Sequence, residues 1–186
     1  MIWVLLIFNF VILGIFIVGF AKCFHRCPPG KILVIYGKMK TGHGGPKCIT
    51  KGATFVFPFI QSYQYLDLKV SDVAINLRDA HSKQDDRVEV SGSFTVGIST
   101  EPSVLPHAAE RLMGLEDHEI ESLAKSIIQG QVRLICASRD SDELKGDEAF
   151  VREVRKNVER ELNKVGLTQI NANLDVRVVP KKVNLF

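Results

Sequence analysis

The chain has 186 residues, of which 46% are apolar, and its formal net charge at pH 7 is +3. This length fits one membrane segment plus one domain of ordinary size, and so mild a charge argues against a nucleic-acid partner. Residues 1–21 contain no Asp, Glu, Lys, Arg or His, so all 24 basic and 21 acidic residues follow them. The composition therefore predicts an apolar head and a charged domain.

The apolar head, residues 1–21, is interrupted only by Asn9, Gly14 and Gly19. As a helix it would be about 30 Å long, which matches the hydrocarbon core of a bilayer. A cleaved signal peptide is the alternative, since Gly19 and Ala21 are small, but the basic region that precedes such a peptide is missing. We therefore expect an uncleaved membrane anchor, with spanning and hairpin insertion both open.

Basic residues follow the head closely, starting in the juxtamembrane segment, residues 22–30. The positive-inside bias then predicts a cell-membrane protein whose domain lies on the cytoplasmic side. The residues concerned are Lys22, Arg26, Lys31, Lys38 and Lys40.

Two of the four cysteines, Cys23 and Cys27, lie beside the membrane segment. They are candidates for S-acylation in a eukaryotic cell, and unmodified thiols are the alternative. With His25 they resemble half of a zinc site, but no second pair of ligands follows at a suitable spacing. We therefore expect reduced thiols, no metal and no other cofactor.

Strand patterns dominate residues 31–100. Residues 31–38 form a short apolar run, and residues 41–46 (TGHGGP) a glycine-rich turn that lacks the lysine of a phosphate loop. Two alternating runs then meet with a one-residue slip near residues 71–72, which predicts a turn or bulge there. Residues 88–98 alternate cleanly, as in a half-buried antiparallel strand.

An aromatic run, FVFPFI, occupies residues 55–60. Its proline argues against a simple central strand. Phe55, Phe57 and Phe59 would either be buried in the core or form a second membrane contact, and both readings are open. Together with Trp3 in the head, they are the candidate membrane-contact residues.

The period changes to about 3.6 after residue 102, which predicts helices over residues 103–113, 117–138 and 147–165. Asp117 is the expected N-cap of the second helix, and Gly166 the expected C-cap of the third. A returning strand follows from the alternation over residues 170–178. The order of elements indicates an α+β fold with a mostly antiparallel sheet and packed helices. The apolar face of the second helix comprises Ile120, Leu123, Ala124, Ile127, Ile128, Leu134 and Ile135.

A narrow apolar stripe marks the third helix and is the candidate self-association surface. It contains Val151, Val154, Val158 and Leu162, opposite a face rich in Arg, Lys and Glu. That charged face is either solvated or part of an oligomer contact.

No pattern indicates catalysis. The five histidines are scattered, and the chain lacks a Gly-x-Ser-x-Gly elbow, an HExxH motif and a Walker lysine. We therefore expect that the protein is not an enzyme.

The ordered motifs resemble the SPFH (stomatin/prohibitin/flotillin), or Band 7, domain and most closely a flotillin. The motifs are the apolar head, CPPG at residues 27–30, GGPKCI at residues 44–49 and GATFVFP at residues 52–58, followed by a strand. The resemblance divides the chain into an anchor (1–21), a juxtamembrane segment (22–30), an SPFH-like domain (31–179; mainly β over 31–100, helices and a returning strand over 101–179) and a tail (180–186).

The resemblance implies a non-catalytic scaffold that binds membrane lipids, forms homo-oligomers or hetero-oligomers with related SPFH proteins, and organises client proteins in microdomains. Flotillins continue into a long coiled coil, and no sustained heptads are present here. A short form and a fragment are both open. The alternative function is a regulatory subunit that binds one membrane protease or channel.

Overall fold

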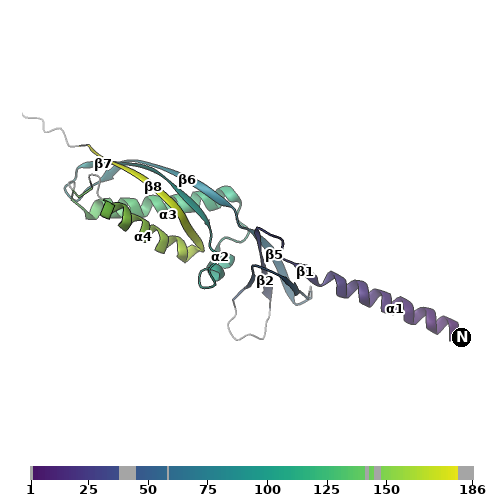
Figure 1. Ribbon diagram of the computed structural model, residues 1–186. Coiled ribbons are helices and arrows are strands. Elements are labelled where there is room, and N and C mark those ends of the chain that lie inside the picture. The colour runs from purple at the N-terminus through teal and green to yellow at the C-terminus, as the bar shows by residue number, and fades with distance from the viewer. Residues whose placement is uncertain (1, 38–44, 58, 141–142, 145–147, 180–186) are drawn as a thin grey trace, which may run out of the picture. The chain divides into compact units, whose positions relative to one another are not determined.

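Figure 1 shows a computed structural model of the chain, in which two compact units follow one another. We call them the N-terminal unit, Met1–Asp67, and the C-terminal unit, Leu68–Phe186. Residues 41–44 of the expected turn and the expected tail lie outside the described residues. The structure describes residues 2–37, 45–57, 59–140, 143–144 and 148–179.

The N-terminal unit contains one helix and two small antiparallel sheets. One sheet pairs β1 with β4, and the other has the order β3-β2-β5. The strand expected at residues 31–38 is confirmed as β2. The elements are α1 (Ile2–Lys22), β1 (Phe24–Arg26), β2 (Lys31–Gly37), β3 (Lys47–Ile49), β4 (Ala53–Phe55) and β5 (Gln61–Asp67).

Helix α1 is apolar on all sides, and every one of its described side chains is exposed. Within the described part of the chain, no helix combines the length and the apolarity needed to cross a membrane. The anchor over residues 1–21 stays a prediction.

The core of the N-terminal unit is small. Leu33 and Ile35 of β2 meet Val56, and all three are at most 3% exposed. The partly buried side chains around them are Cys27, Ile49 and Tyr65. Strand β2 supplies this core because its apolar run buries both of its faces.

The C-terminal unit is an antiparallel sheet of order β6-β7-β8 with helices packed on it. Helix α3 packs against β6, α4 against β8, and the two helices against each other (Figure 1). The mixed fold with antiparallel sheets and packed helices is as expected. The elements are β6 (Val70–His81), β7 (Arg87–Ile98), α2 (Leu105–Arg111), α3 (Asp117–Ser138), α4 (Glu148–Val165) and β8 (Leu167–Val179).

Two predictions are confirmed: the alternation of buried and exposed side chains in β7, and the end of α4 at Gly166. Val88, Val90 and Phe94 are fully buried on one side of the central strand. Gly166 ends α4 with a φ of +90°, a conformation that glycine adopts without a steric penalty. The chain then turns directly into β8, which pairs with β7.

The turn or bulge predicted near residues 71–72 lies elsewhere in the structure. The chain leaves strand geometry at residues 68–69, between β5 and β6. The two registers therefore belong to two strands in different units. The irregularities within the sheet fall elsewhere, between Leu77 and Ala80 of β6 and beside Thr95 and Val96 of β7.

Two expectations for α3 are also wrong. Glu116, not Asp117, is the N-cap, and its backbone N–H donates to Glu119 Oε2 at 2.9 Å. Leu134 is 64% exposed, because at about 100° per residue it lies about 120° around the helix from the buried Ile128. The buried residues of α3 are Ala124, Ile128, Val132, Ile135 and Cys136.

Candidate membrane-contact site

Three phenylalanines gather where α1 ends, and we call them the aromatic cluster: Phe20, Phe24 and Phe55. Phe24 of β1 lies opposite Phe55 of β4, and their ring centroids are 5.2 Å apart. The ring of Phe20, in the last turns of α1, is 5.1 Å from the ring of Phe55. The pairing of β1 with β4 thus joins the end of the helix to the aromatic run.

The chain after β4 carries a second group of exposed apolar residues, the tip loop, defined as Phe57, Phe59 and Ile60. Their exposed fractions are 53%, 99% and 63%. The N–H groups of Ile60 and Gln61 donate to the Phe57 carbonyl at 3.0 and 2.8 Å, and the Gln61 side chain accepts from the Phe57 N–H at 3.2 Å. The loop is therefore a hydrogen-bonded turn that presents apolar side chains to solvent.

Val56 explains why its aromatic neighbours point outward. Its side chain is 1% exposed against Leu33, and its N–H donates to the Cys23 carbonyl at 2.8 Å. Because successive side chains of an extended chain point to opposite sides, burial of Val56 directs Phe55 and Phe57 away from the core. Of the two readings of the aromatic run, the structure shows exposure.

Basic groups border the aromatic cluster. The Arg26 guanidinium lies 5.9 Å from the centroid of the Phe24 ring, and Lys22 ends α1. The His25 and Tyr63 rings are 4.0 Å apart. This ring pair involves the neighbour of Phe24 in β1, whose side chain points to the other face of the strand. Cations beside an apolar surface suit the headgroup region of an anionic leaflet.

Trp3 is 80% exposed near the opposite end of α1. At 1.5 Å per residue it lies about 25 Å along the helix from Phe20. Aromatic rings are therefore exposed near both ends of this apolar helix.

The two candidate acylation sites differ in environment. The Cys23 thiol is partly exposed, with its Sγ 3.3 Å from the Gly19 carbonyl. The Cys27 thiol packs against the core of the N-terminal unit, with its Sγ 3.1 Å from the Lys31 carbonyl and 3.3 Å from the Ile49 carbonyl. A long acyl chain fits Cys23 better, because a chain on Cys27 would disturb that packing.

The candidate self-association residues are largely in the core of the C-terminal unit. Val154, Val158 and Leu162 are 0% exposed, so they are not available to a second folded copy. Only Val151 is partly exposed. Of these four side chains, a contact between folded copies has access to Val151 alone.

Cys136 is fully buried, and burial raises the pKa of its thiol to about 11, which keeps it protonated and unreactive at neutral pH. Within the described ranges, no three His, Cys, Asp or Glu side chains are grouped to hold a metal ion.

Sequence reasoning named Trp3, Phe55, Phe57 and Phe59 but missed Phe20 and Phe24. Those two become part of the site only through the pairing of β1 with β4, which joins segments distant in sequence. Local periodicity carries no signal for such a pairing.

The mixed fold with antiparallel sheets agrees with the comparison to known families. The model of the SPFH domain / Band 7 family matches residues 25–184, so the chain belongs to this family. Among the described elements, the matched region covers the three helices after α1 and the strands of all three sheets, apart from Phe24 at the start of β1.

The relatives that match are flotillins. Flotillin-like protein FloT of Bacillus subtilis (strain 168) is 26% identical over 178 residues, which are 90% of this chain and 35% of that protein. Flotillin-1 of Carassius auratus is 23% identical over 81% of this chain and 36% of its own length. Flotillin-like protein 3 of Arabidopsis thaliana is 30% identical over 65% of this chain and 26% of its own length. The chain thus spans about a quarter to a third of the length of these relatives.

Proposed function

We propose that this chain is a membrane-associated scaffold. Its apolar head and exposed phenylalanines bind lipid, and its domain assembles with other copies or with related SPFH proteins to gather client proteins in microdomains. The membership in the SPFH domain / Band 7 family and the similarity to flotillins support this proposal. The observation that carries it is the exposed aromatic surface at the end of α1.

Water contact is costly for this surface. Full burial of a phenylalanine side chain is worth roughly 1.5–3 kcal/mol. The tip loop and the aromatic cluster expose several such side chains on one small unit, beside Arg26 and Lys22. A bilayer interface removes the rings from water and offers anionic headgroups to the cations. The head and this surface would act as two membrane signals.

A double substitution in the tip loop tests the second signal. Phe57→Ser with Phe59→Ser should weaken binding to anionic liposomes in flotation assays, while the circular dichroism spectrum stays unchanged. Leu134→Ser is the matched control, because Leu134 is 64% exposed in the C-terminal unit. Equal binding of all three proteins would contradict a membrane role for the tip loop.

The head is tested on cell membranes. Alkaline carbonate extraction should leave the full chain in the pellet, and protease added to the cytoplasmic side of sealed vesicles should digest its domain. Release into the supernatant, or protection inside the vesicles, would overturn the cytoplasmic scaffold. Mild detergent pull-down then separates a scaffold, which returns mainly itself and related proteins, from a regulatory subunit, which returns one stoichiometric membrane enzyme.

Acylation would be a third membrane-binding signal, which can be tested separately from the head and the tip loop. We propose Cys23 as the modified residue, since its thiol is the less packed of the two. Acyl-exchange labelling in a eukaryotic host should fall with Cys23→Ser and persist with Cys27→Ser. Labelling that depends on Cys27 alone would contradict this assignment.

A further inference from the structure

Strand β8 is an edge of the C-terminal sheet, because the strand order is β6-β7-β8. Its first half is protected. The Ala172 carbonyl accepts a hydrogen bond from the Arg155 guanidinium, and the Ala172 N–H donates to Asn171 Oδ1 at 2.9 Å. The register beside Ile170 is irregular. Capped groups and bulges are ways in which proteins prevent pairing at a sheet edge.

The second half of β8 lacks this protection. From Ala172 to Val179 its register with β7 is regular, so alternate residues present their backbone groups to the same side. Leu174, Val176 and Val178 therefore present N–H and C=O groups to the open edge, as Ala172 does. Among the described residues, no side chain caps these groups. They can accept another strand.

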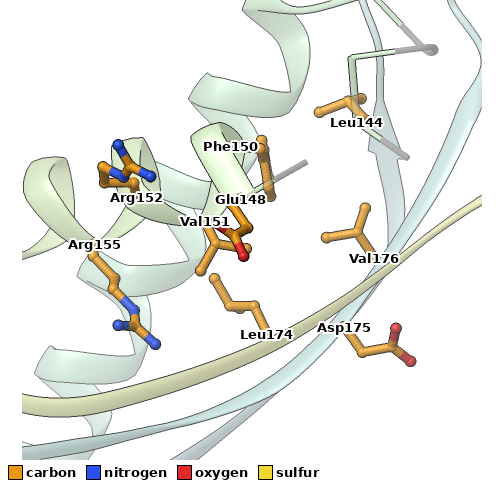
Figure 2. Close-up of a pocket in the computed structure, with 9 residues that line it drawn as sticks. All are labelled: Leu144, Glu148, Phe150, Val151, Arg152, Arg155, Leu174, Asp175 and Val176. Atoms are coloured by element: carbon orange, nitrogen blue, oxygen red, sulfur yellow. The ribbon is translucent and has the colours of Figure 1, made fainter. Parts of the chain in front are cut away.

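Side chains beside this open edge form a groove. Leu174 and Val176 point from β8 toward Phe150 and Val151 of α4, while Asp175 points away from the helix (Figure 2). The groove has a volume of about 470 Å³. Charged side chains of α4, Glu148, Arg152 and Arg155, also line this groove, beside its apolar residues.

The opposite face of the same segment carries two charges of opposite sign. Arg177 Nη2 lies 3.3 Å from Asp175 Oδ2, and both side chains are mostly exposed. They flank Val176 symmetrically. In an antiparallel pair of two β8 strands centred on Val176, each Asp175 lies opposite Arg177 of the second copy, and each Leu174 lies opposite Val178. Charge, apolarity and hydrogen-bond direction all fit this single register.

We propose that β8 is a self-association edge, on which two copies pair antiparallel about Val176 to form a continuous six-stranded sheet. The inference rests on the proposed function, because it names the surface through which the scaffold assembles. The groove beside α4 accepts the partner's Val176 and Val178 side chains. Val151, the one candidate self-association residue that is partly exposed, lines this groove.

The charges provide the first test, by analytical ultracentrifugation of the full chain in detergent. Asp175→Arg alone and Arg177→Asp alone place like charges opposite one another and should each weaken the dimer roughly tenfold or more. The double swap D175R/R177D should restore wild-type affinity. A mixture of the two single variants should form mixed dimers. Equal affinity of all variants, or no rescue by the swap, would overturn the proposal.

A thiol scan provides the second test, in membranes. The Cα atoms of a hydrogen-bonded antiparallel pair are about 5.5 Å apart, which a disulfide can bridge. Val176→Cys should therefore link two copies on mild oxidation, with the bond mapped by mass spectrometry. Leu174→Cys is the matched control, since two such positions would lie about 13 Å apart and should not link. Linking at 174 but not at 176 would rule out this register.

The outcomes separate this inference from the proposed function. If β8 pairing fails while carbonate extraction and flotation succeed, the scaffold stands and this edge is not its assembly surface. If a foreign extended peptide is found on β8 instead of a second copy, the proposal is overturned. Charge-reversed variants should keep full membrane binding, because Asp175 and Arg177 lie in the C-terminal unit, outside the candidate membrane-contact site.

Discussion

The two units place phenylalanine differently: the C-terminal unit buries it, and the N-terminal unit exposes it. In the C-terminal unit, Phe94 and Phe150 are 0% and 1% exposed and fill the space between sheet and helices. In the N-terminal unit, Phe55, Phe57 and Phe59 are 44%, 53% and 99% exposed, and aliphatic residues form the core instead. An apolar residue kept outside a core that could have used it indicates a surface with a binding role.

The largest expected effect is on the C-terminal unit. Phe94→Ala should lower its free energy of unfolding by roughly 3–5 kcal/mol, because it leaves a cavity between β7 and the helices. Urea unfolding of the full chain in detergent, followed by circular dichroism, measures this loss. A loss below about 1 kcal/mol would mean that Phe94 is not part of a close-packed core.

A smaller loss in the free energy of unfolding is expected for a substitution at Gly166, where α4 turns into β8. Gly166→Ala would place a Cβ atom 2.2 Å from the backbone of Ala108 in α2, at a φ of +90°. The strained backbone costs about 1–3 kcal/mol, and the clash adds to it. Gly114→Ala is the matched control, since Gly114 has a φ of +84° and no atom within 4 Å of the added Cβ. Equal losses for both variants would show that α2 does not pack closely there.

The buried thiol of Cys136 predicts a pH dependence of the stability of the C-terminal unit. Its pKa is raised by burial from 9.0 to about 11, so between these values the unfolded chain loses this proton and the folded chain keeps it. Stability is therefore complete below pH 9 and falls as pH rises toward 11, by about 2 kcal/mol. Cys136→Ala should remove this part of the decrease in unfolding titrations. Burial and the nearby Cys48 also raise the pKa of Tyr36, whose contribution has the same sign and should remain.

Local patterns predicted the elements of the C-terminal unit well and the candidate site only in part. The alternation in β7 and the span of α3 follow from periodicities that one segment contains. This reasoning failed at two residues. It assigned Leu134 to the buried face of α3, but Leu134 is exposed. It assigned Val154 of α4 to a self-association surface, but Val154 is buried in the core. Both depend on what packs against the helix, which is set by the sheet and not by the helix's own sequence.

The aromatic run, residues 55–60, likewise shows that local sequence does not decide which side chains are buried. Its composition fits a core segment and a membrane contact equally well. The pairing of Phe24 with Phe55, and the burial of Val56, decide between them. These are long-range contacts, and no spacing within residues 55–60 encodes them.

The smallest expected change in stability is the sharpest test of the comparison. Phe59 is 99% exposed, so Phe59→Ala should change the free energy of unfolding by less than about 0.5 kcal/mol, the range of surface substitutions. Its affinity for anionic liposomes should still fall, because the ring contributes only when a bilayer covers it. A protein that loses stability but not liposome binding would place Phe59 in the core of the folded chain and remove it from the membrane contact. Loss of binding without loss of stability would show that the N-terminal unit keeps its phenylalanines outside for the lipid.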